Sequence, residues 1–295
     1  MPRSMTRELE NLLEEAYNVL RRSGRRVDII EYPLRRRRAF DLVCNGRRNI
    51  FARIVYDAGN LSREDANELR ASAHAYGASP IVIAKYVYGY EAEDDVVYER
   101  HGLYVISIEG LKQVARDEPL FILNSHGVYT VKINPKKLRR LREERGMSLG
   151  ELADRLGVSR KTVYEYERGT MRLSVDKAIK LFDIFGGEVF EPINILEVPK
   201  EETYDLVEPD VRLEEMIINY LRKKGYRVVH LRRTPIDIIG YRRREDTISV
   251  IVKHFISERR FLLKVNEAEK IVSLTGSQGV IVEDEKDLDH IEREN

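Results

Sequence analysis

Basic side chains gather in three blocks of the sequence, and each block could bind an anionic partner. Residues 21–48 carry a net charge of +7, residues 136–172 carry +5 and residues 222–260 carry +8. Acidic side chains collect at 197–215 and 283–294. Blocks of Lys and Arg attract phosphate and other anions. Solvated, ion-paired surfaces would give the same pattern, so the charges alone leave both interpretations open.

The chain as a whole is nearly neutral, with 51 Lys and Arg against 50 Asp and Glu in 295 residues. This length predicts two or three domains. A hydrophobic content of 42% excludes a disordered chain. Cys44 is the single cysteine, so an internal disulfide is excluded, and its apolar neighbours predict a buried thiol.

Several other classes are excluded by what the sequence lacks. No stretch approaches the roughly 18 uncharged apolar residues of a membrane span, and the first residues lack the apolar core of a signal peptide. No Cys and His spacing is typical of a zinc site. We therefore expect a soluble cytoplasmic protein without a cofactor or a metal ion.

Signals that begin and end helices divide residues 135–186 into four predicted helices. Pro135 and Gly146 bound the first helix, and Ser148 with Glu151 forms a capping box at the start of the second. The third spans 160–168, and the fourth begins at Ser174. The side chains predicted to face inward are Leu138, Leu141, Leu149, Leu152, Ala153, Leu156, Val163, Tyr166, Ala178, Leu181, Phe182 and Phe185.

The second and third predicted helices have the spacing of a helix-turn-helix. Ala153, Gly157 and Val163 stand at relative positions 0, +4 and +10. Two helices that cross steeply need a small residue at their contact, glycine in a left-handed turn, and an aliphatic residue that fills the corner. In this motif the second helix enters the major groove of DNA.

The stretch from Ser148 to Gly169 resembles the Cro-type helix-turn-helix of phage repressors. The similarity covers about fifty residues and includes the turn Leu156-Gly157-Val158-Ser159. One position departs from the pattern, because Gly150 stands where this class often has a Gln that contacts a DNA phosphate.

This resemblance implies which residues contact DNA. The first turn of the recognition helix, 159–168, would reach base edges, and basic residues around it would contact phosphates. Glu167 is expected to pair with a neighbouring helix instead. The candidate DNA-binding residues are Ser159, Arg160, Lys161, Thr162, Tyr164, Glu165, Arg168, Arg172, Lys136, Lys137 and Arg140.

The segments that flank the helix-turn-helix resemble each other. Each begins with an amphipathic helix, 6–22 or 210–224, that ends in a basic, glycine-containing turn. Apolar strands, a helix (63–76 or 258–275) and a closing strand follow in the same order. The sequence therefore predicts a small α/β unit that is duplicated on either side of the central helices.

This order of elements resembles the core of restriction endonucleases and resolvases. The resemblance implies a magnesium site with an Asp on one strand, a Glu-x-Lys on the next strand and often a Glu from the first helix. Asp41 and Asp237 match the first acid, and Arg53 and Lys253 match the cation. The helix acid is matched loosely by two residues, Glu14 and Glu215. The second strand acid is replaced by Phe51 and Ile251, so we expect degenerate sites without catalytic residues.

Smaller features include three tyrosines and two histidines. Tyr86, Tyr88 and Tyr90 alternate on a predicted strand or hairpin, which favours a half-buried strand face but also allows a surface on which bases stack. His101 and His126 stand in glycine-flanked turns, where surface histidines are expected.

The chain also contains the stretches Phe40-Asp41-Leu42-Val43, Gly77-Ala78-Ser79-Pro80, Val97-Tyr98-Glu99-Arg100-His101-Gly102 and Gly127-Val128-Tyr129-Thr130-Val131-Lys132-Ile133. Through these stretches and the helix-turn-helix it resembles, over nearly its full length, the archaeal family of "putative HTH-type transcriptional regulatory proteins". The predicted fold is α/β plus all-α, with a lambda-repressor-like central domain between two endonuclease-like domains.

The predicted function is a homodimeric, sequence-specific regulator of transcription that binds double-stranded DNA and is not an enzyme. The alternatives are a metal-dependent nuclease and a non-specific architectural DNA-binding protein. A small-molecule effector is left open. The predicted domains are an N-terminal endonuclease-like domain (1–120), a β connector (121–134), the DNA-binding domain (135–192), an acidic linker (193–209) and a C-terminal endonuclease-like domain (210–295).

Overall fold

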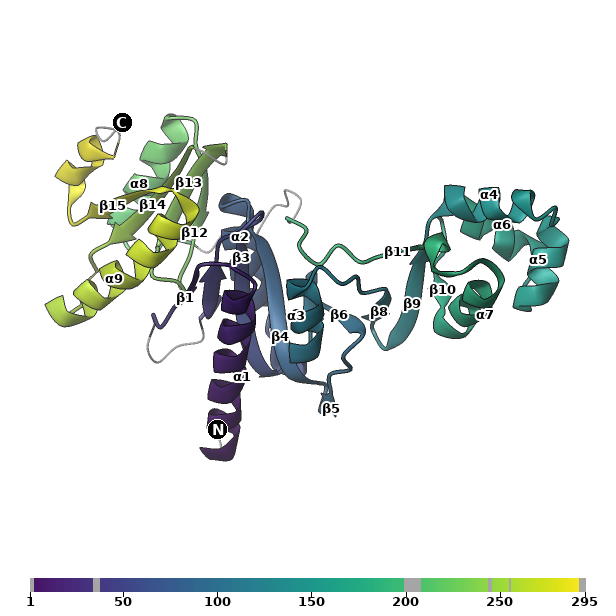
Figure 1. Ribbon diagram of the computed structural model, residues 1–295. Coiled ribbons are helices and arrows are strands. Elements are labelled where there is room, and N and C mark those ends of the chain that lie inside the picture. The colour runs from purple at the N-terminus through teal and green to yellow at the C-terminus, as the bar shows by residue number, and fades with distance from the viewer. Residues whose placement is uncertain (1–2, 34–37, 199–207, 244–245, 255, 292–295) are drawn as a thin grey trace.

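The computed structural model describes residues 3–33, 38–198, 208–243, 246–254 and 256–291. These residues form three lobes in a row, with the helical lobe at one end and the C-terminal sheet at the other (Figure 1). Parts of the first and third basic blocks (34–37, 244–245), of the acidic linker (199–207) and of the acidic tail (292–295) lie outside the described residues. Within the described part, no helix is both long enough and apolar enough to cross a membrane.

The N-terminal lobe is a mixed sheet covered by helices on both faces. The sheet order is β1-β2-β3-β4-β7-β6-β8-β9-β10, with β5 paired to β4 and β11 paired to β9. Its helices are α1 (Arg3–Arg22), α2 (Arg63–Ala75) and α3 (Ile108–Ala115). Its strands are β1 (Val27–Ile29), β2 (Leu42–Cys44), β3 (Ile50–Asp57), β4 (Ser79–Val87), β5 (Tyr90–Glu91), β6 (Val96–Arg100), β7 (Leu103–Ile106), β8 (Ile122–Ser125), β9 (Val128–Ile133), β10 (Leu173–Ser174) and β11 (Phe190–Glu191).

The helical lobe contains α4 (Pro135–Glu144), α5 (Leu149–Leu156), α6 (Arg160–Arg168) and α7 (Val175–Phe185). The local signals explain these bounds. The Ser148 side chain and Glu151 form the predicted capping box, and Gly157 and Gly169 end their helices with φ of 66° and 71°. These left-handed conformations are the ones that favour glycine. The short strands β10 and β11 pair with β9, so the lobe is tied to the N-terminal sheet.

One inward-facing residue of the fourth predicted helix is wrong. Phe182 does not face inward, because 56% of its surface is exposed. The core closes over Ala178, Leu181 and Phe185, and Phe182 lies at the edge of this stripe beside Gly187. Ser174 stands at the N-cap of α7, but its side chain makes no capping hydrogen bond.

The C-terminal lobe is a four-stranded sheet of order β12-β13-β14-β15. Its strands β12 (Arg227–His230), β13 (Ile238–Arg243) and β14 (Asp246–Val252) are antiparallel, and β15 (Gln278–Val282) is parallel to β14. The helix α8 (Arg212–Lys223) precedes the sheet and α9 (Glu258–Thr275) lies between β14 and β15. The same pattern occurs in the N-terminal sheet, where β1, β2 and β3 are antiparallel and β4 is parallel to β3.

The two sheets share one hydrophobic core. Helices α2 and α9 lie between them, and each contacts strands of both sheets. This core joins Phe51 and Leu69 of the N-terminal lobe to Ile239, Phe261 and Ile271 of the C-terminal lobe. A separate core beneath α1 and α3 covers the outer face of the first sheet, and another beneath α8 covers the outer face of the second. The N- and C-terminal lobes are therefore packed as one body.

The segment that was predicted as the start of a linker is packed against the N-terminal lobe. Ile195 is buried in the core beneath α1. The carbonyl oxygen of Leu196 accepts hydrogen bonds from Arg48 at 2.7 Å and from the Ser79 hydroxyl at 2.8 Å. Strands β8 and β9, predicted as a connector, continue the N-terminal sheet. The predicted domain boundaries remain a prediction.

Candidate functional sites

The recognition helix α6 presents its first turn to solvent. The Ser159 hydroxyl accepts a hydrogen bond from the Thr162 backbone N–H at 3.1 Å and so caps the helix. Arg160 and Lys161 are exposed in this turn, and neither makes an ion pair with the described residues. Tyr164 is exposed one turn later. This arrangement leaves two cations at a helix N-terminus, where backbone N–H groups also favour an anionic partner.

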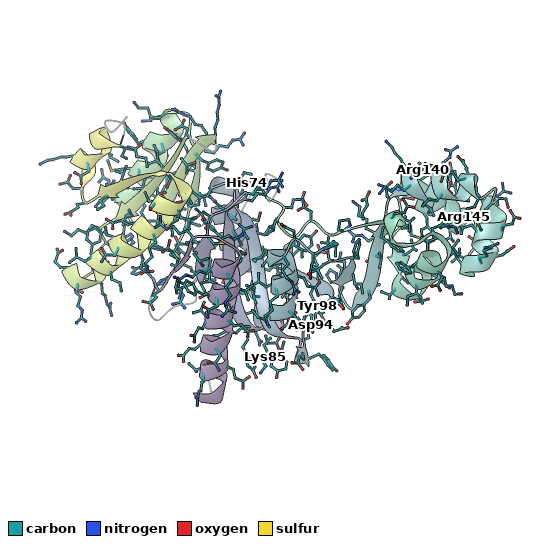
Figure 2. All side chains as sticks on the ribbon, in the orientation of Figure 1. His74, Lys85, Asp94, Tyr98, Arg140 and Arg145 are labelled. Carbon is teal, nitrogen blue, oxygen red and sulfur yellow. The ribbon has the colours of Figure 1, made fainter. Side chains whose placement is uncertain are left out.

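The other candidate residues of the helical lobe differ in their exposure and in whether they contact other side chains of the protein. Lys136, Lys137 and Arg172 are exposed. The guanidinium of Arg168 lies 5.7 Å from the centre of the Tyr164 ring. Figure 2 labels Arg140 on the upper side of this lobe.

Three of the remaining candidates have partners within the protein. Arg140 pairs with Glu144 at 3.4 Å and more distantly with Glu188 at 3.9 Å. Glu165 is half-buried, and its carboxylate accepts a hydrogen bond from the Thr170 hydroxyl. Thr162 is also half-buried, and its hydroxyl is 2.9 Å from the Ser159 hydroxyl.

Glu167 pairs with a neighbouring helix, as predicted. Its carboxylate accepts hydrogen bonds from Nε of Arg142 at 2.5 Å and from Nη2 at 3.0 Å. Arg142 is buried and also donates to the carbonyl oxygen of Met147 at 2.8 Å. This charged pair joins α4 to α6, so one cation of the central basic block supports the fold.

Two lysines that sequence reasoning missed lie beside the turn of the helix-turn-helix. Nζ of Lys180 and Nζ of Lys177 are 3.6 and 3.8 Å from the position that a Cβ on Gly157 would occupy. Both residues belong to α7, about 20 residues further along the chain. Their contribution to the surface depends on the packing of α7 against α5, which no local spacing reveals.

The carboxylate of Asp41 is buried at the start of β2 and fully engaged. Its Oδ2 accepts a hydrogen bond from the Ile54 backbone N–H at 2.8 Å. Arg53 contacts both oxygens, at 2.8 and 2.9 Å, and Nε of Arg38 lies 3.0 Å from Oδ1. Asp41 therefore joins two strands and is neutralised by two arginines.

Asp237 is buried at the start of β13 in a comparable position. Its Oδ2 accepts from the Val252 backbone N–H at 2.7 Å. Nζ of Lys264, which is only 1% exposed on α9, lies 2.7 and 2.6 Å from the two oxygens. Nε2 of His254 is 3.2 Å from Oδ1.

The prediction that Arg53 and Lys253 take the same place is wrong. In the N-terminal sheet Leu42 pairs with Ala52, whereas in the C-terminal sheet Ile238 pairs with Val250. These registers differ by two residues, so Arg53 corresponds to Ile251. Lys253 points elsewhere and pairs with Glu258 and Glu283.

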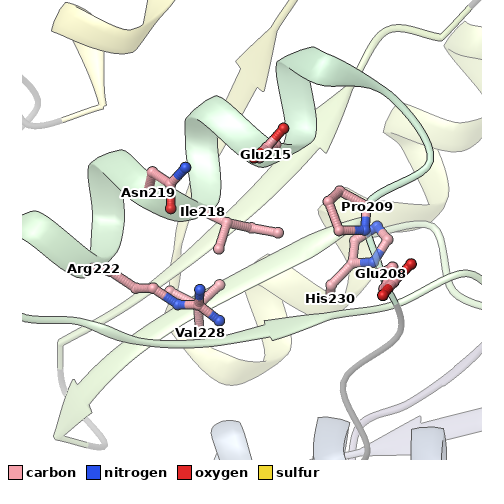
Figure 3. A pocket seen from close by; sticks show the side chains of 8 residues that line it. All are labelled: Glu208, Pro209, Glu215, Ile218, Asn219, Arg222, Val228 and His230. Atoms are coloured by element: carbon pink, nitrogen blue, oxygen red, sulfur yellow. The ribbon is translucent and has the colours of Figure 1, made fainter.

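The two predicted helix acids also lie outside these centres. Glu14 and Glu215 are exposed. Glu215 lines a hollow of about 260 Å³ between α8 and β12, together with Asn219 and Arg222 (Figure 3). The buried acid of α8 is its neighbour Glu214, which is one residue earlier and lies 3.3 Å from Nε2 of His230 and 3.4 Å from Nε2 of His254.

Glu214, Asp237 and His254 each offer a ligand atom within 4.8 Å of the others. They border a cavity of about 360 Å³ that also contacts Tyr32 and Pro33 of the N-terminal lobe. Oxygen and imidazole donors are typical ligands of transition metals. However, the set does not fit the magnesium site implied for nucleases, because the strand acid is absent and Lys264 already neutralises Asp237. In the N-terminal centre, Arg53 occupies the strand position that corresponds to Ile251.

The electrostatics of the C-terminal centre favour an ionised acid. Burial would raise the pKa of Glu214, but the hydrogen bond and electrostatic interaction with His230, the Asp210 backbone N–H and the nearby His254 outweigh it, so this pKa lies below its ordinary value. In the N-terminal sheet, burial raises the pKa of the Cys44 thiol to about 11. Cys44 is fully buried, as predicted, and is a packing residue.

Comparisons with known proteins agree with this architecture. Residues 9–120 match the PD-(D/E)XK superfamily domain, and residues 138–191 match the helix-turn-helix family. No solved structure matches the chain.

Similar proteins extend over almost the whole chain. A protein of Aeropyrum pernix named "Putative HTH-type transcriptional regulatory protein" is 34% identical over 98% of this chain and 91% of its own length. Proteins with the same descriptive name from Thermococcus gammatolerans (31% identity, 90% and 82%) and Pyrococcus horikoshii (34%, 93% and 86%) are also similar. The chain therefore belongs to the archaeal family of "putative HTH-type transcriptional regulatory proteins", with an N-terminal PD-(D/E)XK domain and a helix-turn-helix domain.

Proposed function

We propose that this protein is a sequence-specific transcription regulator that inserts α6 into the major groove of double-stranded DNA. The observation that carries the proposal is the capped, exposed first turn of α6, with Arg160 and Lys161 unpaired among the described residues. The helix-turn-helix match and the names of the relatives support it. Arg160, Lys161, Thr162, Tyr164 and Glu165 are assigned to base edges.

The surrounding residues are assigned to phosphates. Ser159, Arg168, Arg172, Lys136 and Lys137 are exposed around α6 and would fix its orientation without reading sequence. Arg140 is the weakest candidate, because two glutamates already neutralise it. Gly150 has no side chain for the phosphate contact that is frequent in this class, and we add Lys177 and Lys180 as replacements on the same side of the turn.

The assembly is proposed to be a homodimer that reads two half-sites about 10 base pairs apart. We further propose that the N- and C-terminal lobes arose by duplication and serve as a scaffold. Their similar strand order and the similar position of Asp41 and Asp237 support this. The scaffold role, rather than catalysis, is supported by the ion pairs that engage both carboxylates.

Selection from random oligonucleotides tests the proposal. A recovered consensus should bind the native chain, and Arg160→Ala with Lys161→Ala should weaken that binding at least tenfold, because a bidentate base contact contributes about 1–3 kcal/mol. Binding should also weaken steeply with salt, since phosphate contacts release counterions. The matched control is Arg222→Ala with Lys223→Ala on α8, which should bind normally. Unchanged binding by the α6 variant would reject the assignment.

The same selection separates an architectural protein, for which no consensus would emerge. A nuclease is the other alternative, and the PD-(D/E)XK match over residues 9–120 favours testing it. Supercoiled plasmid should remain uncut with magnesium or manganese. Cleavage that is lost in Asp41→Ala or Asp237→Ala would establish a nuclease instead.

A further inference from the structure

Two hairpin turns of the N-terminal lobe hold bulky residues in left-handed backbone conformations. Tyr88 precedes Gly89 in the β4–β5 turn with φ of 54°, and His126 precedes Gly127 in the β8–β9 turn with φ of 53°. Two-residue turns of this kind favour Asn, Asp or Gly at the first position. Strained backbone of this sort is concentrated at functional sites.

Both turns are held by side chains beneath them. The carboxylate of Asp57 accepts hydrogen bonds from the backbone N–H groups of Tyr88 at 2.9 Å and Gly89 at 2.8 Å. The side-chain oxygen of Asn124 accepts from the Gly127 N–H at 3.0 Å. The fold therefore fixes the two bulky residues at the turn tips.

These two turns border one cavity of about 340 Å³. Four tyrosines line it, from the β4–β5 hairpin (Tyr88 and Tyr90), from β6 (Tyr98) and from β9 (Tyr129). Figure 2 labels Tyr98 in this part of the lobe. Tyr98 is buried, whereas Tyr90 is 80% exposed and Tyr88 is 57% exposed. Large aromatic surface is thus presented to solvent around a hollow.

The charged residues of the cavity are mostly acidic. Glu91, Glu93 and Glu99 line it, against one arginine, Arg100, and the imidazole of His126. Glu93 accepts hydrogen bonds from the hydroxyls of Tyr98 and Tyr129, which holds it between the two rings. Aromatic faces and carboxylates together bind organic cations, because both present negative charge to the ligand.

Arg100 shows how a cation sits in this environment. Its guanidinium lies 5.1 Å from the centre of the Tyr88 ring, and Nη1 donates to the Tyr88 hydroxyl at 2.6 Å. Among the described residues, no Lys or Arg lies over the rings of Tyr90 or Tyr129. The acids of the cavity also do not converge as a metal-ligating group within the described chain, which argues against a bare metal ion.

We propose that this cavity binds an alkylammonium ion, with Tyr90 and Tyr129 against its methylene or methyl groups and Glu91, Glu93 and Glu99 near its charge. Linear polyamines and quaternary ammonium ions share this chemistry. The cavity is linked to the helical lobe through β9, which carries Tyr129 near its start and ends one residue before the N-cap of α4. A bound ligand would therefore contact the strand that carries the helix-turn-helix.

Isothermal titration calorimetry of the full chain without DNA tests the binding. At an ionic strength of about 0.15 M, exposed charges more than about 8 Å apart are largely screened, so non-specific attraction is reduced. Spermidine and choline are titrated in separate arms, and saturable binding of either one is expected and identifies the kind of cation. Absence of saturable binding in both arms overturns the proposal. DNA is not involved, so failure here leaves the DNA-binding proposal intact.

Variants of exposed residues connect the binding to this cavity. Tyr90→Leu should weaken it about two- to fivefold, the range for an exposed cation–π contact. Glu91→Gln with Glu99→Gln should weaken it at least as much. The matched control is Glu269→Gln on the exposed face of α9, which removes one charge far from the cavity and should leave binding unchanged. Equal weakening by the control, or full displacement by an equal concentration of magnesium, would show non-specific charge attraction and overturn the site.

Discussion

Asp41 in the N-terminal sheet and Asp237 in the C-terminal sheet can be compared atom by atom. Each is buried before its strand, and each accepts a hydrogen bond from a backbone N–H of the next strand, at 2.8 Å from Ile54 and 2.7 Å from Val252. The cations differ in origin. Arg53 reaches Asp41 from the neighbouring strand with help from Arg38, whereas Lys264 reaches Asp237 from a helix.

The surroundings differ as well. Asp237 has Glu214 and two histidines nearby, so its centre contains several groups that can gain or lose protons. The described surroundings of Asp41 are dominated by arginines, which stay charged. A backbone position that the two lobes share therefore does not fix the chemistry around it, and the two centres should respond differently to mutation and to pH.

The largest expected effect is at Lys264. Lys264→Met should lower the free energy of unfolding by about 3–5 kcal/mol, because it removes the buried ammonium group and leaves the Asp237 carboxylate, among the described side chains, only the His254 imidazole, at 3.2 Å. Urea unfolding at neutral pH measures this. Lys253→Met is the control, since its partners are exposed glutamates, and its effect should be small. A similar loss in both variants would mean that Lys264 does not neutralise Asp237.

A smaller effect is expected at the other centre. Arg53→Met should cost about 1–3 kcal/mol, the range for hydrogen bonds to charged groups, because Arg38 still contacts Asp41. The same urea titration measures it. If Arg53→Met costs as much as Lys264→Met, then the second arginine gives no compensation and the contrast between the centres is lost.

The stability contributed by the two centres should also respond differently as pH falls. The pKa of Glu214 in the folded protein lies below its ordinary value. Glu214 therefore stabilises the fold fully above its unfolded pKa of about 4.3, and this stabilisation is lost as pH falls through the lower folded pKa. The wild type should therefore lose stability more steeply below about pH 4.3 than Glu214→Gln. Thermal unfolding along a pH series measures the difference. Parallel curves for the two proteins would contradict this role.

The smallest effect is expected where the two lobes meet. The Tyr76 hydroxyl of the N-terminal lobe lies 2.6 Å from the Ser249 hydroxyl of the C-terminal sheet. Tyr76→Phe should cost about 1 kcal/mol, because Ser249 keeps its contact with Ser277 at 2.8 Å. Chemical denaturation measures it, with Tyr90→Phe as an exposed control. No loss would mean that this contact does not stabilise the interface.

The parts of the molecule that the sequence predicts well are those with local causes. The limits of α6 follow from Ser159 and Gly169, which act within a single turn of the helix. The burial of Cys44 and the ion pairing of Glu167 were also predicted correctly. A free cysteine among apolar residues is usually buried, and an acidic side chain is repelled by the phosphates of DNA.

The parts that were missed have distant causes. Lys264 meets Asp237 across 27 positions of the chain, and the choice of Glu214 over Glu215 depends on which face of α8 meets the sheet. The sequence comparison matched Arg53 with Lys253, but the strand registers of the two sheets differ by two residues. The spacing of residue types contains none of these relations, because tertiary packing decides them.

The shared layer of α2 and α9 has a consequence for protein synthesis. Helix α2 ends at Ala75 and α9 ends at Thr275, so about 200 residues are added between the two halves of one hydrophobic core. At roughly 5–20 residues per second, this takes about 10–40 s. During that interval the apolar side of α2 has no C-terminal sheet to cover it. We therefore expect the nascent N-terminal lobe to expose apolar surface, of the kind that chaperones bind, until the last quarter of the chain leaves the ribosome.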